Sequence, residues 1–417
     1  MRDATFSVLK ALAIILVVLS HAGAPGWLSD FVFIFHVPAF FICAGYFFNT
    51  CYLDDEKTFV GKRVRRLYLP FLRWSVFFLL IHNLLFYTGI LNEQYGNAQG
   101  GVLHPYTWHA FFQRLWSIVF NMSGYDEFLC GSFWFFRALF LSSLAFLLLF
   151  KLLRRNRSLT TDVQVAWSIL GIVFALTMWK TLGGLHVTGV AQGGYRELMG
   201  VFFMSCGFLY RRYQERVPMN WKVAAVCVLL LVSASVFFPS SMSWQADVVH
   251  FLSLPLPALA GFYLLLYVSK KLVCAGGVLK RGLIYIGEHT LYVFAFHLVA
   301  FKLVSAVKVA YCGLPWQQVG CHPVIHEKTS SFDFFFLLYL LVGVSVPLLW
   351  NAAYRRLCAR YDLSLGTIML FVARIGGRVA LFSVACMRML GVKMWEGAKS
   401  FIQGIKAILN ASNPNDE

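Results

Sequence analysis

The chain has 417 residues, of which 59% are hydrophobic and only 13% are charged. Because a soluble globular domain has about 25% charged residues, this composition excludes an ordinary soluble protein and indicates a membrane protein. The net charge of +17 would suit nucleic-acid binding in a soluble protein, but the positive residues lie at the ends of apolar runs; we therefore expect a lipid bilayer as partner and no nucleic acid.

Ten apolar runs are long enough to cross a bilayer as helices. They predict an all-α fold, a polytopic membrane helix bundle. The runs cover residues 5–23, 31–49, 70–90, 132–150, 163–181, 196–211, 221–238, 248–269, 282–304 and 332–353.

The distribution of Lys and Arg between these runs predicts the topology. Twenty-one of these residues lie in or beside the connections that follow even-numbered runs, and five lie in the odd-numbered connections. Lys and Arg concentrate on the cytoplasmic side of membrane proteins. We therefore expect both termini in the cytoplasm.

The first apolar run carries two ionisable residues, Lys10 and His21. At 100° per residue, eleven steps bring His21 to within about 20° of the Lys10 face and about 16 Å along the axis. A charge at mid-bilayer costs about 3 kcal/mol, so an ionisable residue inside a span is a candidate for function. The spacing predicts one helical stripe with a cation at mid-bilayer and an imidazole near the outer surface.

Two other interpretations of this run stay open. Lys10 can extend its flexible stem to the near membrane surface, which leaves His21 as an interfacial residue. Residues 1–24 also resemble a signal peptide with Ala22-Gly23-Ala24 as cleavage site, although the cut would fall before Pro25.

Five motifs follow one another between about residues 4 and 356. They are Lys10–x10–His21; Phe35-His36-Val37-Pro38-Ala39-Phe40-Phe41 with Gly45-Tyr46; Arg63-Val64-Arg65-Arg66-Leu67-Tyr68-Leu69-Pro70; Phe133-Trp134-Phe135-Phe136; and Ile286-Gly287-Glu288-His289-Thr290-Leu291-Tyr292 leading to His297. In this order they resemble the acyltransferase-3 family of integral membrane proteins. The chain departs from the family pattern at two places, because Lys10-Ala11 replaces the more usual Arg-Gly and Ala44 stands where Ser is common.

The resemblance implies an acyl-CoA-dependent O-acyltransferase of the bacterial inner membrane. Such an enzyme moves an acyl group, usually acetyl, from cytoplasmic acyl-CoA to a hydroxyl of an extracytoplasmic glycan or lipid-linked saccharide. Acetyl-CoA is then a substrate, and no tightly bound cofactor is expected. The alternative is a glycolipid or polysaccharide transporter or flippase, in which Lys10 and the outer histidines line a substrate path.

The residues can be assigned roles in acyl transfer. We expect His21 to act as the base, because a neutral imidazole with a pKa of about 6.5 can take the proton of a hydroxyl. Lys10 is expected to polarise the thioester carbonyl or attract a CoA phosphate. Candidates for binding the acceptor or orienting His21 are His36, Trp134, Arg137 and His297. Candidates for binding the CoA phosphates are Lys62, Arg63, Arg65 and Arg66.

Structural roles compete with each of these assignments: an interfacial histidine, an ion pair, a hydrogen bond within the bundle, or a topology signal. No zinc-type Cys/His spacing is present, so no metal site is expected. Whether Cys312 and Cys321 form a disulfide on the outer side stays open. Residues 1–360 are expected to form the acyltransferase-3-like transmembrane domain, and residues 361–417 a basic amphipathic extension with a disordered tail.

Overall fold

The computed structural model describes residues 3–96, 104–123, 129–326 and 334–361, and in these ranges the regular structure is entirely helical. The chain forms two compact units, residues 1–349 and 350–417. The first holds all helices from α1 to α14 and the start of α15, and of the second the structure describes the end of α15 (Phe335–Tyr361). The predicted extension 361–417 lies almost wholly outside the described residues, and the predicted boundary at residue 360 stays a prediction.

Eight helical segments are long and apolar enough to cross a bilayer. They are α1 (Ala4–His21); α2 (Gly26–Phe33) with α3 (His36–Tyr46); α4 (Glu56–Arg63), η2 (Val64–Tyr68) and α5 (Leu69–Tyr87); α7 (Trp134–Arg154); α8 (Asp162–Leu182); α11 (Val248–Ser253) with α12 (Pro255–Ala275); α14 (Thr290–Cys312); and α15. The prediction of an all-α polytopic membrane bundle is thereby confirmed.

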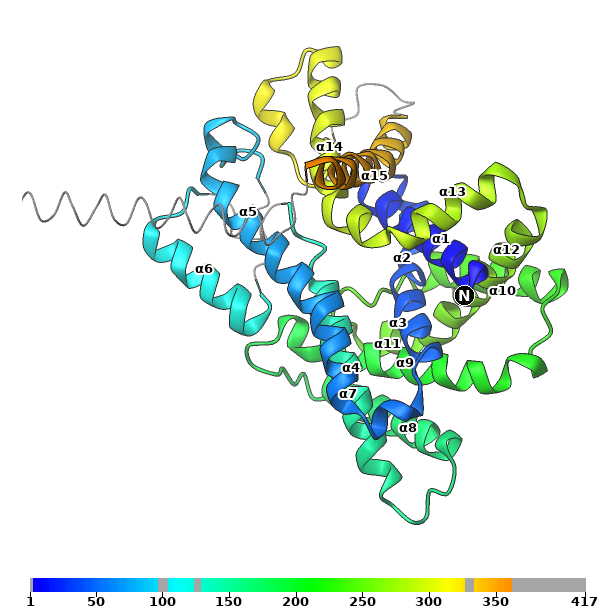
Figure 1. Cartoon of the computed structure of the whole chain (residues 1–417). Coiled ribbons are helices and arrows are strands. Elements are labelled where there is room, and N and C mark those ends of the chain that lie inside the picture. The colour runs from blue at the N-terminus through cyan, green and yellow to red at the C-terminus, as the bar shows by residue number, and fades with distance from the viewer. Residues whose placement is uncertain (1–2, 97–103, 124–128, 327–333, 362–417) are drawn as a thin grey trace, which may run out of the picture. The chain divides into compact units, whose positions relative to one another are not determined.

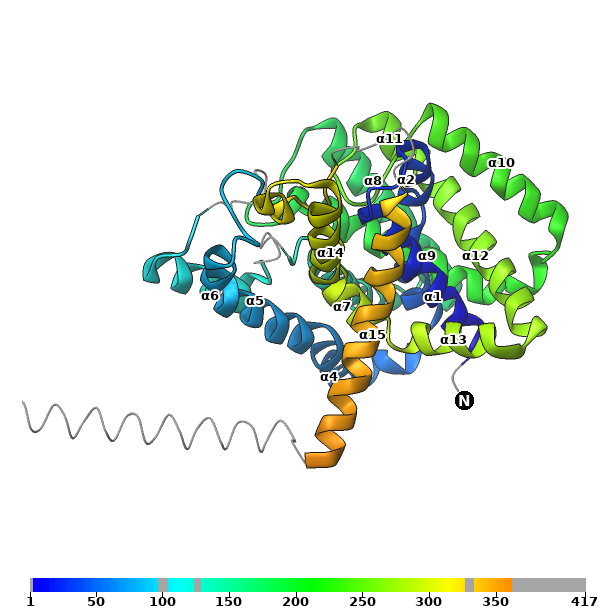
Figure 2. The same ribbon diagram turned by 90° about the horizontal axis from the view of Figure 1, so that it is seen from above.

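Two predicted spans differ from these eight. Helix α10 (Trp221–Phe237) is apolar but has only 17 residues, and α9 (Tyr195–Tyr213) carries charged residues in its first and last turns. Figure 2 shows α10 beside α12 at the edge of the bundle, whereas α9 packs against α3, α7 and α8 and has most of its side chains buried. The number of ten spans and the cytoplasmic placement of both termini stay predictions.

Close packing of α3 against α9 depends on glycine. A Cβ atom on Gly45 would overlap the carbonyl oxygen of Met204, and one on Gly207 would overlap that of Ile42. The two backbones therefore approach more closely than any side chain would allow, as small residues permit in membrane helices. This contact fixes α3, and with it His36, against the centre of the bundle.

The second span is interrupted between α2 and α3. Helix α2 ends at Phe33, and α3 starts at His36, whose Nδ1 lies 2.6 Å from the carbonyl oxygen of Val32. Pro38 is tolerated in the first turn of α3, because the N–H that proline lacks has no helical partner there. The break thus places a histidine at a helix start, with its side chain buried.

The long connection before α7 contains a further helix, α6 (Trp108–Asn121), which runs antiparallel beside α5 (Figures 1 and 2). At one end the side chain of Asn83 and the backbone of Tyr106 exchange two hydrogen bonds of 2.9 and 2.7 Å. At the other, the hydroxyl of Tyr68 donates to the carbonyl oxygen of Val119 at 2.7 Å. The exposed face of α6 carries an aromatic stripe of Trp108, Phe112, Trp116 and Phe120.

Candidate active site

A cavity of about 360 Å³ lies between α1, α3, α4 with η2, α7 and the start of α14. Its volume falls in the range of small-molecule sites, which is about 300–1,000 Å³. Four residues of α1 at helical spacing line it: Lys10, Ile14, Val17 and His21. Lys10 and His21 therefore share one stripe and one cavity, as their spacing predicted.

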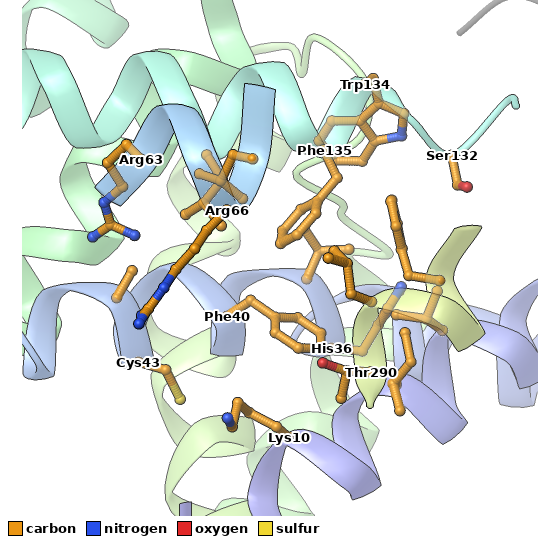
Figure 3. A pocket seen from close by; sticks show the side chains of 18 of the residues that line it. Lys10, His36, Phe40, Cys43, Arg63, Arg66, Ser132, Trp134, Phe135 and Thr290 are labelled. Carbon is orange, nitrogen blue, oxygen red and sulfur yellow. The ribbon is translucent and has the colours of Figure 1, made fainter. Parts of the chain in front are cut away.

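One end of the cavity is cationic. Lys62, Arg63 and Arg66 line it together with Lys10, and no Asp or Glu is among the lining residues that the structure describes. Figure 3 shows the side chains of Lys10, Arg63 and Arg66 gathered here, with Cys43 between Arg66 and Lys10. This end is suited to an anionic ligand.

Aromatic side chains support two of these cations. The Nζ atom of Lys62 donates to the Tyr52 hydroxyl at 3.0 Å, and the Arg63 guanidinium lies 4.9 Å from the centroid of the Phe59 ring. Tyr52 and Phe59 also line the cavity. The aromatic rings hold the cations in place without neutralising their charge.

The opposite end of the cavity carries imidazoles, hydroxyls and an indole: His21, His36, Ser132, Trp134 and Ser243. Figure 3 shows His36, Ser132 and Trp134 away from the cationic cluster. A neutral imidazole and hydroxyl groups can bind a substrate that is itself a hydroxyl compound. The cavity therefore joins an anion-binding end to a hydroxyl-binding end.

The hydrogen bonds around His297 determine which nitrogen of His21 carries the proton. Nδ1 of His297 lies 3.1 Å from the carbonyl oxygen of Val293 and 2.9 Å from that of Phe294, so it must be a donor. In the neutral ring, Nε2 of His297 then accepts, and its neighbour at 3.2 Å is Nδ1 of His21. His21 Nδ1 is the donor in this pair, which leaves the lone pair of His21 on Nε2.

The structure brings seven of the ten predicted site residues to the cavity and places three elsewhere. His297 does not line it but contacts His21. Arg65 is exposed outside it. Arg137 lines a separate cavity on the other face of α7, where its Nε lies 3.7 Å from the Glu197 carboxylate and its Nη2 donates to the carbonyl oxygen of Gly189 at 3.2 Å.

Several cavity residues had no signal in the sequence. Ser132 directly precedes one motif and Thr290 lies inside another, but neither was assigned a role, and Ser243 comes from the loop between α10 and α11. His322, in the loop after α14, does not line the cavity but interacts electrostatically with His21, because that loop folds back onto α14. Its position depends on tertiary contacts such as the 2.6 Å hydrogen bond from Lys302 Nζ to the carbonyl oxygen of Cys321.

Comparison of the sequence with known protein families identifies the family to which the cavity-forming region belongs. Residues 3–354 match the sequence profile of the acyltransferase-3 family, which is described as an acyltransferase domain. Neither the curated proteins nor the solved structures contain a significant match to this chain. The matched region holds α1 to α14 and every residue of the cavity. The chain therefore belongs to the acyltransferase-3 family and is a multi-pass membrane acyltransferase.

Proposed function

We propose that this protein transfers an acyl group, in the first instance acetyl, from acyl-CoA to a hydroxyl of a surface glycan or lipid-linked saccharide. The observation that carries the proposal is the single cavity with Lys62, Arg63 and Arg66 at one end and His21 and His36 at the other. A donor with several phosphates requires a cationic binding site, and an acceptor that reacts through a hydroxyl requires a base and hydrogen-bonding groups. The site lies in the bacterial inner membrane in this proposal, with the cationic end toward the cytoplasm.

The donor enters at the cationic end. The phosphates of CoA bind Lys62, Arg63 and Arg66, and the pantetheine arm extends past Lys10 toward His21, about 16 Å along α1. Charge-assisted hydrogen bonds from guanidinium to phosphate are among the strong ones in proteins. Lys10 stabilises negative charge on the donor within the low-dielectric wall of the cavity.

The chemical step takes place at His21. Nε2 of His21 accepts the proton of the acceptor hydroxyl as its oxygen attacks the thioester carbon. The carbon–sulfur bond then breaks, the acyl group leaves as an ester of the acceptor, and the proton passes to the sulfur of CoA. His297 is a positioning residue, because it holds His21 in the tautomer with a lone pair on Nε2.

The test is an assay with the purified full-length protein and radiolabelled acetyl-CoA. It measures transfer of the labelled acetyl group to glycans extracted from the membranes of the cells that make the protein. We expect transfer by the wild type and a loss of about 10²–10⁴-fold in His21→Ala. Phe86→Leu is the control for folding. Phe86 lies near the end of α5 that is remote from η2, and it does not line the cavity. Movement of glycolipid between leaflets without acylation would contradict the proposal and indicate a flippase.

A further inference from the structure

A cavity of about 540 Å³, distinct from the one beside Arg137, lies next to the active-site cavity at its His21 end. We call it the second cavity. Its walls come from α2, from the loop between α10 and α11, and from His250 in the first turn of α11. The residues that matter for its chemistry are Asp30, Phe33, Ser240, Trp244, Gln245 and Asp247.

The two cavities adjoin. Phe33 lines both of them, and the consecutive residues Ser243 and Trp244 line the first and the second. Arg196, which is buried, connects their walls: its guanidinium lies 4.2 Å from the centroid of Trp134 and 5.8 Å from that of Trp244. Its Nε also donates to the carbonyl oxygen of Ser243 at 2.6 Å. One guanidinium thus fixes an indole in each cavity.

A buried hydroxyl in the second cavity lacks a partner. The Oγ atom of Ser240 has no hydrogen-bond partner among the described residues, although the residue is only 6% exposed. Buried polar groups are almost always hydrogen-bonded in folded proteins. Ser240 lines the cavity, so a hydroxyl of a bound ligand would complete its hydrogen bonding.

Further polar groups are held in place around Ser240. The side-chain oxygen of Gln245 accepts a 2.9 Å hydrogen bond from Lys180 Nζ, which leaves its NH₂ group as a donor. Oδ1 of Asp247 accepts from the backbone N–H and the ring of His250, at 2.8 and 2.7 Å, and Asp247 lines the cavity. These hydrogen bonds lower the pKa of Asp247, so its carboxylate is ionised at neutral pH.

This set of groups selects for one class of ligand. Carboxylates and an amide beside an exposed indole offer hydrogen bonds to hydroxyls and a flat apolar face for a sugar ring. The lining contains the carboxylates of Asp30 and Asp247 but no Lys or Arg. The two carboxylates outnumber the one ionisable base of the lining, His250, which contacts Asp247, and neither Lys180 nor Arg196 lines the cavity. A lining with an excess of negative charge disfavours an anionic ligand.

We propose that the second cavity binds an uncharged or amino-bearing saccharide unit of the acceptor, next to the unit whose hydroxyl reaches His21. This inference rests on the proposed acyltransferase function for its link to catalysis, but saccharide binding itself is independent of it. The acceptor is then an oligosaccharide or polysaccharide of at least two units, and it is not a uronic acid polymer at this position.

The test is binding of the full-length protein in lipid nanodiscs to an immobilised panel of neutral, amino and uronic-acid oligosaccharides. We expect binding to neutral or amino saccharides, a loss of at least tenfold in Trp244→Ala, and improved binding of uronic saccharides in Asp30→Asn. Trp27→Ala is the matched control, because Trp27, on α2, is an exposed tryptophan like Trp244 but lines neither cavity. This variant should bind saccharides as the wild type does. No bound saccharide, a preference for uronic saccharides, or equal binding by Trp244→Ala and Trp27→Ala would overturn the proposal.

Acetyl transfer by the same variants separates this proposal from the function. We expect Trp244→Ala to raise the KM for the saccharide acceptor at least tenfold and to leave the KM for acetyl-CoA unchanged. If the wild type binds saccharides but does not use acetyl-CoA, the proposed function fails and the saccharide site stands. If it uses acetyl-CoA and Trp244→Ala changes neither saccharide binding nor the acceptor KM, only the saccharide site fails.

Discussion

Nδ1 of His21 and Nε2 of His297 lie 3.2 Å apart, although 276 positions separate the two residues in the sequence. Because His297 Nδ1 donates to backbone carbonyls, the pair has one arrangement of protons in its neutral form. This relationship makes the role of His297 testable apart from that of His21.

The first prediction concerns His297. In His297→Ala, His21 loses the acceptor for its Nδ1 proton, so kcat for acetyl transfer falls, by less than the ~10²–10⁴-fold expected for His21→Ala. His297→Gln should recover much of the loss, because its side-chain oxygen can accept the same hydrogen bond. Steady-state kinetics would show the change in kcat with an unchanged KM for acetyl-CoA. Equal activity of the Ala and Gln variants would contradict a role in positioning.

The second prediction concerns the arginines of the donor end. Arg63→Gln and Arg66→Gln each remove a charge from the cavity, whereas Arg65→Gln, two positions from the first, removes one outside it. A hydrogen bond to a charged group contributes about 1.5–3 kcal/mol, which corresponds to about a tenfold to hundredfold rise in the KM for acetyl-CoA. Arg65→Gln should leave this KM unchanged. The three values, measured at one salt concentration, distinguish phosphate binding from a general topology signal.

The third prediction concerns Lys10. Its side chain lies at the cationic end of the cavity, on the same stripe of α1 as His21, so Lys10→Met should lower kcat/KM for acetyl-CoA by about tenfold or more. Lys10→Arg keeps the charge and should retain most of the activity. A Lys10→Met variant with full activity and normal insertion would assign Lys10 a structural role.

The fourth prediction concerns the contact of α3 with α9. Gly45→Ala introduces a methyl group where the Met204 carbonyl lies, and overpacking of this kind costs about 1–3 kcal/mol. Gly171→Ala on α8 is the control, because a Cβ there meets no atom within 4 Å. Thermal unfolding in detergent should show a lower midpoint for Gly45→Ala than for the wild type. The midpoint of Gly171→Ala should not be lowered. Equal midpoints would contradict the close approach of the two backbones.

The fifth prediction concerns pH and His322. Burial lowers the pKa of His322 to about 3, from 6.5 in an unfolded chain. Between these two values the unfolded state binds a proton that the folded state does not, so stability rises with pH through this window and falls on acidification below about 6.5. The midpoint of thermal unfolding should therefore fall between pH 7 and pH 5, and the fall should be smaller in His322→Gln. An identical pH dependence in both proteins would show that His322 is accessible to protons in the folded state.

Part of the site follows from local periodicity and part does not. The stripe with Lys10 and His21 was predictable because helix geometry fixes the direction of side chains eleven residues apart. The cluster at residues 62–66 was predictable as a group of cations, but not which of them face the cavity, since that depends on the wide turn of η2. The contact of His21 with His297 and the loop carrying Ser243 and Trp244 required tertiary structure, because no spacing in the sequence relates these elements.

The turn η2 has a further consequence for the third span. A π-helical turn contains one residue more than an α-helical turn, so it sets the rotation of α4 independently of α5. Arg66 and Leu67 thereby face the active-site cavity, while Val64 and Tyr68 face the separate cavity beside Arg137. Removal of a single residue from this turn would rotate Arg63 by about 100° away from its present direction. The wide turn therefore decides which side chains of this continuous span line the active-site cavity and which line the neighbouring one.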